Sequence, residues 1–193
     1  MKNNKKYVFG IPDDEFIRDK VPMTKSEVRA ITVSKLRLNS NSHVLDIGCG
    51  TGSITIECGL ICSEGEVIAI DQKTEAVKLT EKNVKKFGLE NVQIVEGSAP
   101  KDIPRKYYDS IFLGGGSRKI DEIIDFVLNH LKSGGVFVAN TILLDSTYKI
   151  LSALEGRFMD IDVALVQVAK GHQLGGWMMK ANNPIYVISA KLP

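Results

Sequence analysis

A short apolar segment that runs directly into three alternating glycines restricts the possible folds of this chain more than any other stretch. Residues 44–47 read Val-Leu-Asp-Ile, and Gly48, Gly50 and Gly52 follow at every second position. Glycines here let the backbone turn tightly and let a ligand approach it closely. A helix expected after the loop begins with N–H groups that have no partner within the helix. The pattern predicts a strand, a ligand-binding loop and a helix, as in open α/β sheets.

The rest of the chain alternates between short apolar runs and amphipathic stretches. Besides 44–47, we expect strands at 67–70, 92–95, 110–113, 136–140, 161–168 and 185–190. Helices are expected from residue 24 towards 38, and at 53–60, 75–87, 120–131 and 145–154. Strands that alternate with helices form a parallel sheet, and two closing strands with no helix between them must pair antiparallel. We therefore predict an α/β protein with a mostly parallel seven-stranded sheet and an antiparallel closing strand.

Composition narrows the classes of function. The 193 residues fit one domain, 1–193, in which residues 1–23 form a polar arm. A net charge of +2 with scattered basic residues gives no reason to expect a nucleic-acid partner. Neither a membrane-spanning run nor a secretory signal is recognisable, so we expect a cytoplasmic protein without membrane contact. Three cysteines and three histidines suggest neither a disulfide framework nor a metal site.

Two loops after later strands complete a possible cofactor site. Asp71 ends the expected strand at 67–70, where a carboxylate can accept hydrogen bonds from both hydroxyls of a ribose. The segment Gly97–Pro100 follows the third strand and should lie beside an adenine ring. Asp71 has two alternative interpretations, because NAD enzymes place an acid similarly and because it could cap the next helix. We interpret Cys49 as a small residue whose backbone lines the site, not as a nucleophile.

Two features near the chain ends lead to further expectations. Thr24 and Glu27 have the spacing of a capping box, which predicts that the first helix starts with Thr24 as its N-cap. Between the last two strands lie 16 residues, which are expected to form a long loop. Long loops in compact domains are often functional, so its segment Gly171–Gly176 is a candidate for closing over a ligand; the alternative is that Gly175-Gly176 forms only a turn.

The form Asp-x-Gly-x-Gly-x-Gly at 46–52 resembles motif I of class I S-adenosylmethionine (SAM)-dependent methyltransferases, whose Rossmann-like fold matches the expected order of elements. The whole chain also resembles one family, the decarboxylating cobalt-precorrin-6B C15-methyltransferases of cobalamin biosynthesis. Besides motif I, the resemblance rests on the segments 10–16, 22–29, 97–100, 114–117, 176–179 and 183–184. Motifs of methyltransferases that act on amino groups of adenine or glutamine, or on cytosine carbon, are missing.

The resemblance implies a particular reaction. The family methylates C15 of a cobalt-precorrin with SAM as the methyl donor, removes carbon dioxide from the C12 acetate, and forms homotetramers. It implies that the cofactor contacts Thr24, Gly48, Cys49, Gly50, Thr51, Gly52, Asp71 and Ala99. Ser98 departs from the Asp that is common in the family, and His172 from an Arg that relatives can carry.

The corrin precursor is a polycarboxylate, so its site should contain anion-binding groups. Gly114–Ser117 at a helix start is a possible anion site. Arg118, Lys119, Lys170 and Lys180 are candidate carboxylate partners, or part of a solvated basic surface. No acid–base cluster is apparent, so we expect catalysis mostly by positioning, with His172 the best-placed histidine for a proton transfer. A methyltransferase for another small molecule or RNA, and a non-catalytic SAM-binding protein, remain alternatives.

Overall fold

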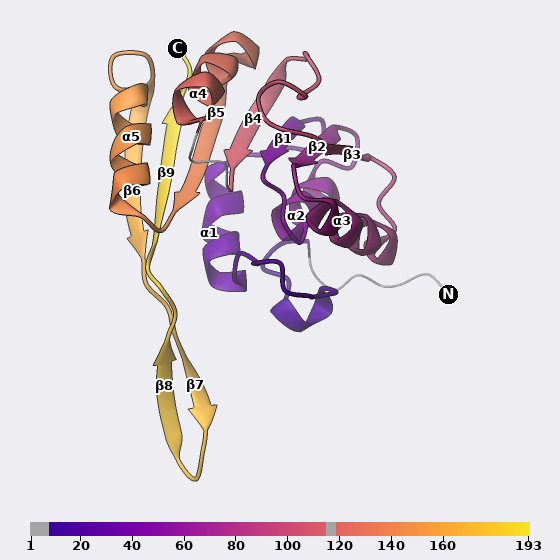
Figure 1. Ribbon diagram of the computed structural model, residues 1–193, viewed down its shortest axis with the longest axis vertical. Coiled ribbons are helices and arrows are strands. Elements are labelled where there is room, and N and C mark those ends of the chain that lie inside the picture. The colour runs from indigo at the N-terminus through magenta and orange to yellow at the C-terminus, as the bar shows by residue number, and fades with distance from the viewer. Residues whose placement is uncertain (1–7, 115–118) are drawn as a thin grey trace.

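The computed structural model describes residues 8–114 and 119–193. Its helices are α1 (Ser26–Lys35), α2 (Ser53–Ile61), α3 (Thr74–Phe87), α4 (Ile120–His130) and α5 (Leu144–Leu154), with a short 3₁₀ helix, η1, at Asp13–Glu15. The first five strands are β1 (His43–Ile47), β2 (Glu66–Asp71), β3 (Val92–Glu96), β4 (Tyr108–Leu113) and β5 (Leu131–Thr141). The remaining strands are β6 (Met159–Val166), β7 (Ala169–Gln173), β8 (Trp177–Ala181) and β9 (Ile185–Lys191). Figure 1 shows this arrangement.

Seven strands form one sheet in the order β3-β2-β1-β4-β5-β9-β6. The pairs among β1 to β5 are parallel, whereas β9 lies between β5 and β6 and is antiparallel to both. The predicted sheet is therefore confirmed, including the antiparallel closing strand. Strand β5 starts before the predicted residue 136, because 131–135 already pair irregularly beside β4.

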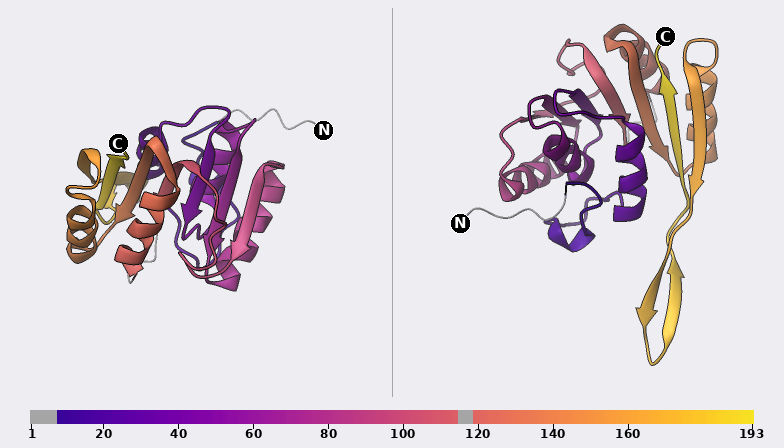
Figure 2. Two further views of the ribbon diagram at one scale, coloured as in Figure 1. Left: turned by 90° about the horizontal axis from the view of Figure 1, so that it is seen from above. Right: turned by 180° about the vertical axis from the view of Figure 1, so that it is seen from behind.

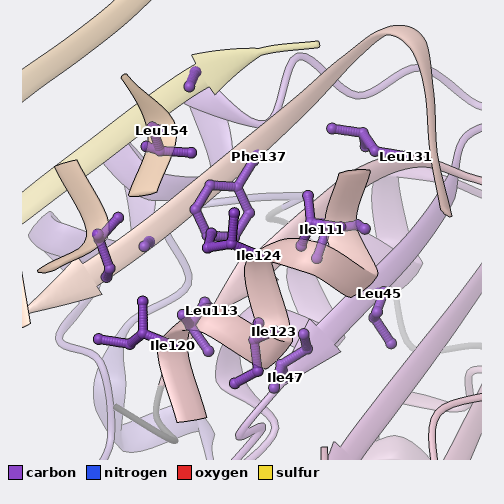
Figure 3. Close-up of a cluster of buried hydrophobic side chains, with 14 of the residues drawn as sticks. Leu45, Ile47, Ile111, Leu113, Ile120, Ile123, Ile124, Leu131, Phe137 and Leu154 are labelled. Atoms are coloured by element: carbon purple, nitrogen blue, oxygen red, sulfur yellow. The ribbon is translucent and has the colours of Figure 1, made fainter. Parts of the chain in front are cut away.

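Side chains of the buried strands alternate between two apolar layers. Leu45 and Ile47 of β1 belong to a cluster with the apolar faces of α4 and α5. Figure 3 shows this cluster, in which Ile120, Ile123 and Ile124 of α4 lie against side chains of the strands. Val44, directly before Leu45, packs instead with residues of α1 and α2 on the other face. Successive side chains of a β-strand point to opposite faces, so the short apolar runs from which the sheet was predicted supply both layers.

The N-terminal arm folds back onto α2 and α3. Ile11 and Phe16 of the arm are almost fully buried and form a third apolar cluster with Ile56 of α2 and Phe87 of α3. The rings of Phe16 and Phe87 lie 5.2 Å apart between centroids. The described part of the arm is therefore packed against the domain and contributes to its core.

The expected long loop between the last two strands of the sheet is not a loop. Residues of β7 and β8 pair antiparallel, from Ala169 opposite Ala181 to Gln173 opposite Trp177. This hairpin projects away from the seven-stranded sheet (Figure 1, Figure 2). In the described part of the chain, no helix is both long and apolar enough to cross a lipid bilayer.

Candidate functional site

The candidate site lies at the carboxyl edge of the sheet, where the strand order reverses. Strands β2 and β4 flank β1, and the connections after β1 and β4 lead to opposite faces. Such a switch point leaves a crevice outside the strand ends, where open α/β sheets bind ligands. The loops that follow β1, β2 and β3, and the ends of β4 and β5, converge there.

The glycine loop after β1 has the backbone that its sequence requires. Gly48, Gly50 and Gly52 have φ values of 80°, 58° and 76°, all in the left-handed region that favours glycine. The N–H of Gly48 donates to the carbonyl of Ile70 over 2.8 Å, which ties the loop to β2. A Cβ atom on Gly52 would lie 2.8 Å from the Thr80 side chain of α3. The third glycine is therefore needed for helix packing as well as for its φ angle.

Asp71 holds the glycine loop and does not cap a helix. Its Oδ2 accepts the N–H of Gly50 over 3.1 Å, and its Oδ1 accepts the N–H of Lys73 over 3.0 Å. The N-cap of α3 is Lys73, without a side-chain cap. A carboxylate has about four lone-pair positions, so these two bonds leave acceptor capacity that faces the site.

Two clefts open at this edge of the sheet. The larger one, which we call the strand-2 cleft, has a volume of about 690 Å³. Its lining residues are Val21, Pro22, Ile47, Gly48, Gly50, Ile70, Asp71, Gln72, Lys73, Ala76, Gly97, Ser98, Ala99, Gly114, Lys119 and Ile123. It combines an acidic group at the end of β2 with an apolar slot beside the 97–99 loop.

The second cleft, the strand-5 cleft, has a volume of about 370 Å³. It is lined by Pro22, Met23, Thr24, Lys25, Val28, Gly48, Cys49, Gly50, Thr51, Ser53, Ile54, Phe112, Gly114, Asn140, Thr141, Ile142, Val166, Val168, Asn182, Asn183 and Ile185. The two clefts share Pro22, Gly48, Gly50 and Gly114. Ligands in the two clefts would therefore meet over the glycine loop.

A buried ionic network fixes the arm that forms one wall of both clefts. Arg29 of α1 donates from Nε to Oε1 of Glu57 in α2 over 2.6 Å, and both side chains are fully buried. Oε2 of Glu57 accepts the N–H of Gly10, and Oε1 also accepts the N–H of Ile11, each over 2.9 Å. Arg29 also donates to the carbonyls of Ile11 and Thr24. The arm segment that ends at Thr24 is thereby attached to α1 and α2.

The predicted capping box is wrong, because the cap comes from the arm. Helix α1 begins at Ser26, its N-cap is Lys25, and neither Lys25 nor Thr24 caps it with a side chain. The N–H of Ser26 donates to Oδ1 of Asp13 over 2.9 Å. The carbonyl of Thr24 is held by Arg29 instead, which keeps Thr24 outside the helix.

Asn83 of α3 joins the arm to the glycine loop. Its buried amide nitrogen donates to the carbonyls of Thr51 over 2.9 Å and of Ile17 over 3.1 Å. Its oxygen accepts the N–H of Ile17 over 2.8 Å. One side chain therefore fixes the position of the loop relative to the arm, a role that no local sequence pattern indicates.

The pKa values of two titratable groups beneath the glycine loop are strongly raised. Burial raises the pKa of Asp46 to about 7, although Thr55 donates to its Oδ2 over 2.5 Å, and its Oδ1 has no partner. Burial and the neighbouring Asp46 carboxylate raise the pKa of the Cys49 thiol well above its usual range. A thiol of this kind stays protonated at neutral pH, which agrees with the expectation that Cys49 is not a nucleophile.

The structure separates the predicted cofactor residues into four groups. Asp71 and Ala99 line the strand-2 cleft, and Gly48 and Gly50 line both clefts. Thr24, Cys49 and Thr51 line only the strand-5 cleft. Gly52 lines neither, because it packs against α3 as described above. These residues lie up to 75 positions apart in the sequence, and the fold brings seven of the eight to one edge of the sheet.

The predicted substrate-binding residues fare differently. Lys170 is paired with Glu27 of α1 over 2.7 Å, and Lys180 lies opposite Lys170 on the hairpin. His172, also on the hairpin, lines neither cleft, and nor does the segment Gly171–Gly176. Lys119 lines the strand-2 cleft, 3.5 Å from Oγ of Ser98. Residues 115–117 of the predicted anion site, and Arg118, lie outside the described residues.

Sequence reasoning missed several polar residues of the strand-5 cleft. Asn140 lies next to the last residue of β5, Lys25 is the N-cap of α1, and Asn182 and Asn183 follow β8. A position at the carboxyl end of β5 could have drawn attention to Asn140, whereas nothing local distinguishes Lys25 from other surface lysines. Within the described residues, no group of three or more His, Cys, Asp or Glu side chains could hold a metal ion.

The strand order, the glycine loop after β1 and the acid at the end of β2 define a Rossmann-like methyltransferase. The sequence model of one family, described as "Precorrin methyltransferase domain", matches residues 14–190. The chain belongs to this family of precorrin methyltransferase domains.

Individual relatives agree with this assignment. A protein of Saccharolobus solfataricus described as a probable cobalt-precorrin-6B C(15)-methyltransferase (decarboxylating) is 44% identical, over 95% of this chain and 96% of the relative. The crystal structure of a precorrin-6y C5,15-methyltransferase from Geobacter metallireducens is 40% identical with a TM-score of 0.88, over 96% and 99% of the two chains. That of precorrin 8w decarboxylase from Methanobacterium thermoautotrophicum is 34% identical with a TM-score of 0.85, over 93% and 98%.

Proposed function

We propose that this protein is a SAM-dependent C-methyltransferase that methylates C15 of cobalt-precorrin-6B and removes carbon dioxide from the C12 acetate. The relatives named for this reaction match the chain almost from end to end. The observation that carries the proposal is the pair of clefts that meet at Gly48, Gly50 and Gly114. A methyl donor whose nucleoside lies in the strand-2 cleft and whose methionine part reaches over the glycine loop into the strand-5 cleft would meet there an acceptor bound in the rest of that cleft.

The residues present fit SAM. Asp71 keeps free lone pairs for the two ribose hydroxyls, and Ala99 lies with Ile70, Ala76 and Ile123 along an apolar slot suited to adenine. The bare backbone of Gly50 fits against the arm, because a Cβ atom there would lie 3.2 Å from the carbonyl oxygen of Pro22. Thr51, which follows Gly50 and lines the strand-5 cleft, would border the methionine part.

These observations define the roles that we propose for the eight predicted cofactor residues. Asp71 and Ala99 hold the nucleoside. Gly48, Cys49, Gly50 and Thr51, together with Thr24 from the arm, surround the methionine part. Gly52 shapes the loop and its contact with α3 and does not touch the ligand.

When bound, SAM supplies an electrophilic methyl group, so the chain has to position the reactants and exclude water. The described lining of the strand-5 cleft offers no carboxylate or histidine for acid–base chemistry. The fixed arm and the glycine loop instead hold the acceptor carbon in line with the donor. An apolar wall that includes Phe112, Ile142 and Ile185 favours loss of a carboxylate as neutral carbon dioxide, because it solvates the charge poorly.

In this scheme the electron pair of the broken carbon–carbon bond stays with the substrate, where the conjugated ring absorbs it. No metal or second cofactor is required of the protein for this step. A proton taken up by the substrate can come from water.

We further propose that the protein assembles as a homotetramer. The hairpin supports this proposal, since Leu174, Trp177, Met178 and Met179 all expose half or more of their surface. Exposed apolar patches of this kind mark association surfaces in many proteins. Light scattering should give the mass of four chains, and W177E should shift it towards smaller species; a wild-type monomer would contradict the proposal.

The proposed reaction is tested by incubating the protein with cobalt-precorrin-6B and SAM that carries a labelled methyl group. We expect a product with one labelled methyl group, released carbon dioxide and S-adenosylhomocysteine. Transfer to another small molecule or to RNA, with no product from the corrinoid, would refute the assigned substrate. Binding of SAM without transfer to any acceptor would indicate a non-catalytic binding protein.

A further inference from the structure

The described lining of the strand-5 cleft combines one positive charge with apolar and uncharged polar residues. Lys25 is the one charged residue among the lining residues that the structure describes, and the other polar groups are amides, hydroxyls and a thiol. A carboxylate that enters an apolar cleft loses hydration, which has to be replaced by a cation or by hydrogen-bond donors. The cleft therefore suits an anionic ligand and has a single position where its charge can be matched.

Lys25 lies at the cleft and forms only a long ion pair, with Asp13. Its carbonyl accepts the N–H of Arg29 over 2.7 Å, which fixes its backbone at the start of α1. Its Nζ lies 3.7 Å from Oδ2 of Asp13, a distance beyond a normal hydrogen bond. About a third of its side chain, 35%, is exposed. The ammonium group is therefore available to a second, closer anion.

Two amides enter the same cleft from the neck of the hairpin. Asn182 and Asn183 lie between β8 and β9, and the N–H of Asn182 donates to the carbonyl of Val168 over 2.8 Å. This backbone bond fixes the neck, whereas neither side-chain amide has a hydrogen-bond partner among residues 8–114 and 119–193. By contrast, the Asn140 amide already donates to Oγ1 of Thr32 over 2.9 Å.

We propose that Lys25, with Asn182 and Asn183, forms a subsite that binds one peripheral carboxylate of the substrate and so sets the orientation of the ring. The inference rests on the proposed function, because it assigns a group of the polycarboxylate to this cleft. Lys25 supplies the charge, and the two amides supply N–H donors from the hairpin neck. These residues determine specificity and do not act on the reacting carbon.

The neighbouring lysine on the hairpin has a different role. Lys170 forms a 2.7 Å ion pair with Glu27 and does not line the cleft. It connects the hairpin to α1, next to Lys25. The sequence alone suggested Lys170 and Lys180 as carboxylate partners, whereas the fold directs Lys25 to the cleft.

The first test is K25Q, with K149Q as the matched control, since Lys149 is exposed on α5 and lines neither cleft. We expect K25Q to raise KM for cobalt-precorrin-6B by roughly tenfold or more, as for loss of a charge-assisted hydrogen bond. Its affinity for SAM, measured by calorimetry, should stay unchanged and serves as the check of folding. Unchanged KM in K25Q would overturn the proposal.

The amides are tested by the double variant N182A/N183A, with N129A on the exposed end of α4 as its control. We expect KM to rise severalfold while SAM affinity is retained. A double variant with the KM of N129A would remove the amides from the subsite.

The variant D13N separates a substrate role of Lys25 from a structural one. It removes the charge beside Lys25, while its side-chain oxygen can still accept the N–H of Ser26. If Lys25 acts only through Asp13, D13N will reproduce the KM increase of K25Q, which overturns the proposal. If Lys25 binds substrate, D13N will keep or lower KM. A wild-type protein that does not convert the corrinoid refutes the proposed function itself, whereas an active wild type with an unaffected K25Q refutes only the subsite.

Discussion

The guanidinium of Arg29 and the carboxylate of Glu57 form a fully buried ion pair, with 2.6 Å between Nε and Oε1. The pair links α1 to α2, and Glu57 also accepts two N–H groups from the arm. Arg29 stacks over the ring of Phe16, 4.7 Å from its centroid. These contacts hold residues 22–25 where they form a wall of the strand-5 cleft.

Replacing Glu57 with Gln should destabilise the protein by about 3–5 kcal/mol, because it leaves the buried charge of Arg29 without its main partner. D125N is the control, since the Arg157–Asp125 pair is exposed and should contribute less than about 1 kcal/mol. Urea unfolding measures both. Equal losses in the two variants would show that burial does not set the strength of the Arg29–Glu57 pair.

Replacing Asn83 with Asp should weaken both stability and SAM binding. The isosteric change removes the two N–H donors that hold the carbonyls of Ile17 and Thr51 and puts a negative charge beside them. We expect a loss of about 2 kcal/mol and a SAM affinity lowered roughly tenfold. N129D alters an exposed amide on α4 and should change neither quantity much. Calorimetry that finds wild-type SAM affinity in N83D would contradict the linking role of Asn83.

Replacing Gly52 with Ala should cost more than the same change at Gly88. Both glycines have positive φ, 76° and 63°, so each substitution places an L-residue in the left-handed region at about 1–2 kcal/mol. A Cβ atom at Gly52 also meets Thr80 at 2.8 Å, whereas at Gly88 nothing lies within 4 Å. The difference between the two losses of unfolding free energy therefore measures the cost of the contact with Thr80. No difference would mean that α3 can move away from the loop freely.

Asp46 should make stability fall as pH rises. Its pKa is about 7 in the folded protein against an ordinary value of 3.8, because burial disfavours the charged form. Between these values the folded state keeps a proton that the unfolded state has lost. The contribution of Asp46 is therefore complete below about pH 4 and lost as pH rises to about 7, by about 4 kcal/mol in all.

D46N removes this titration while its amide oxygen can still accept a bond from Thr55. The unfolding free energies of wild type and D46N are measured from about pH 4 to pH 8. As pH rises, the wild type should lose stability relative to D46N. The lowered pKa values of Glu27 and Asp109 act in both proteins and cancel in this difference. A difference that does not vary with pH would show that Asp46 titrates normally.

The sequence by itself determined the sheet and the class of site. A short apolar run such as Val44-Leu45 specifies a buried strand, and Gly48, Gly50 and Gly52 specify the loop, since both depend on steric rules that act within a few residues. The position of Asp71 at the end of the next strand follows from the same local patterns, because parallel strands end at one edge of the sheet. The family resemblance added the reaction.

Only the tertiary structure decided how the site is walled. The cap of α1 comes from Asp13 and not from Thr24, and Lys25 reaches a cleft that the lysines of the hairpin do not. The segment after β6 forms a hairpin because β7 and β8 pair with each other, whereas the sequence predicts a long loop there. Such contacts join residues far apart in the chain, as Asn83 joins Ile17 to Thr51. Their energies depend on burial and mutual distance, which no local pattern of residues encodes.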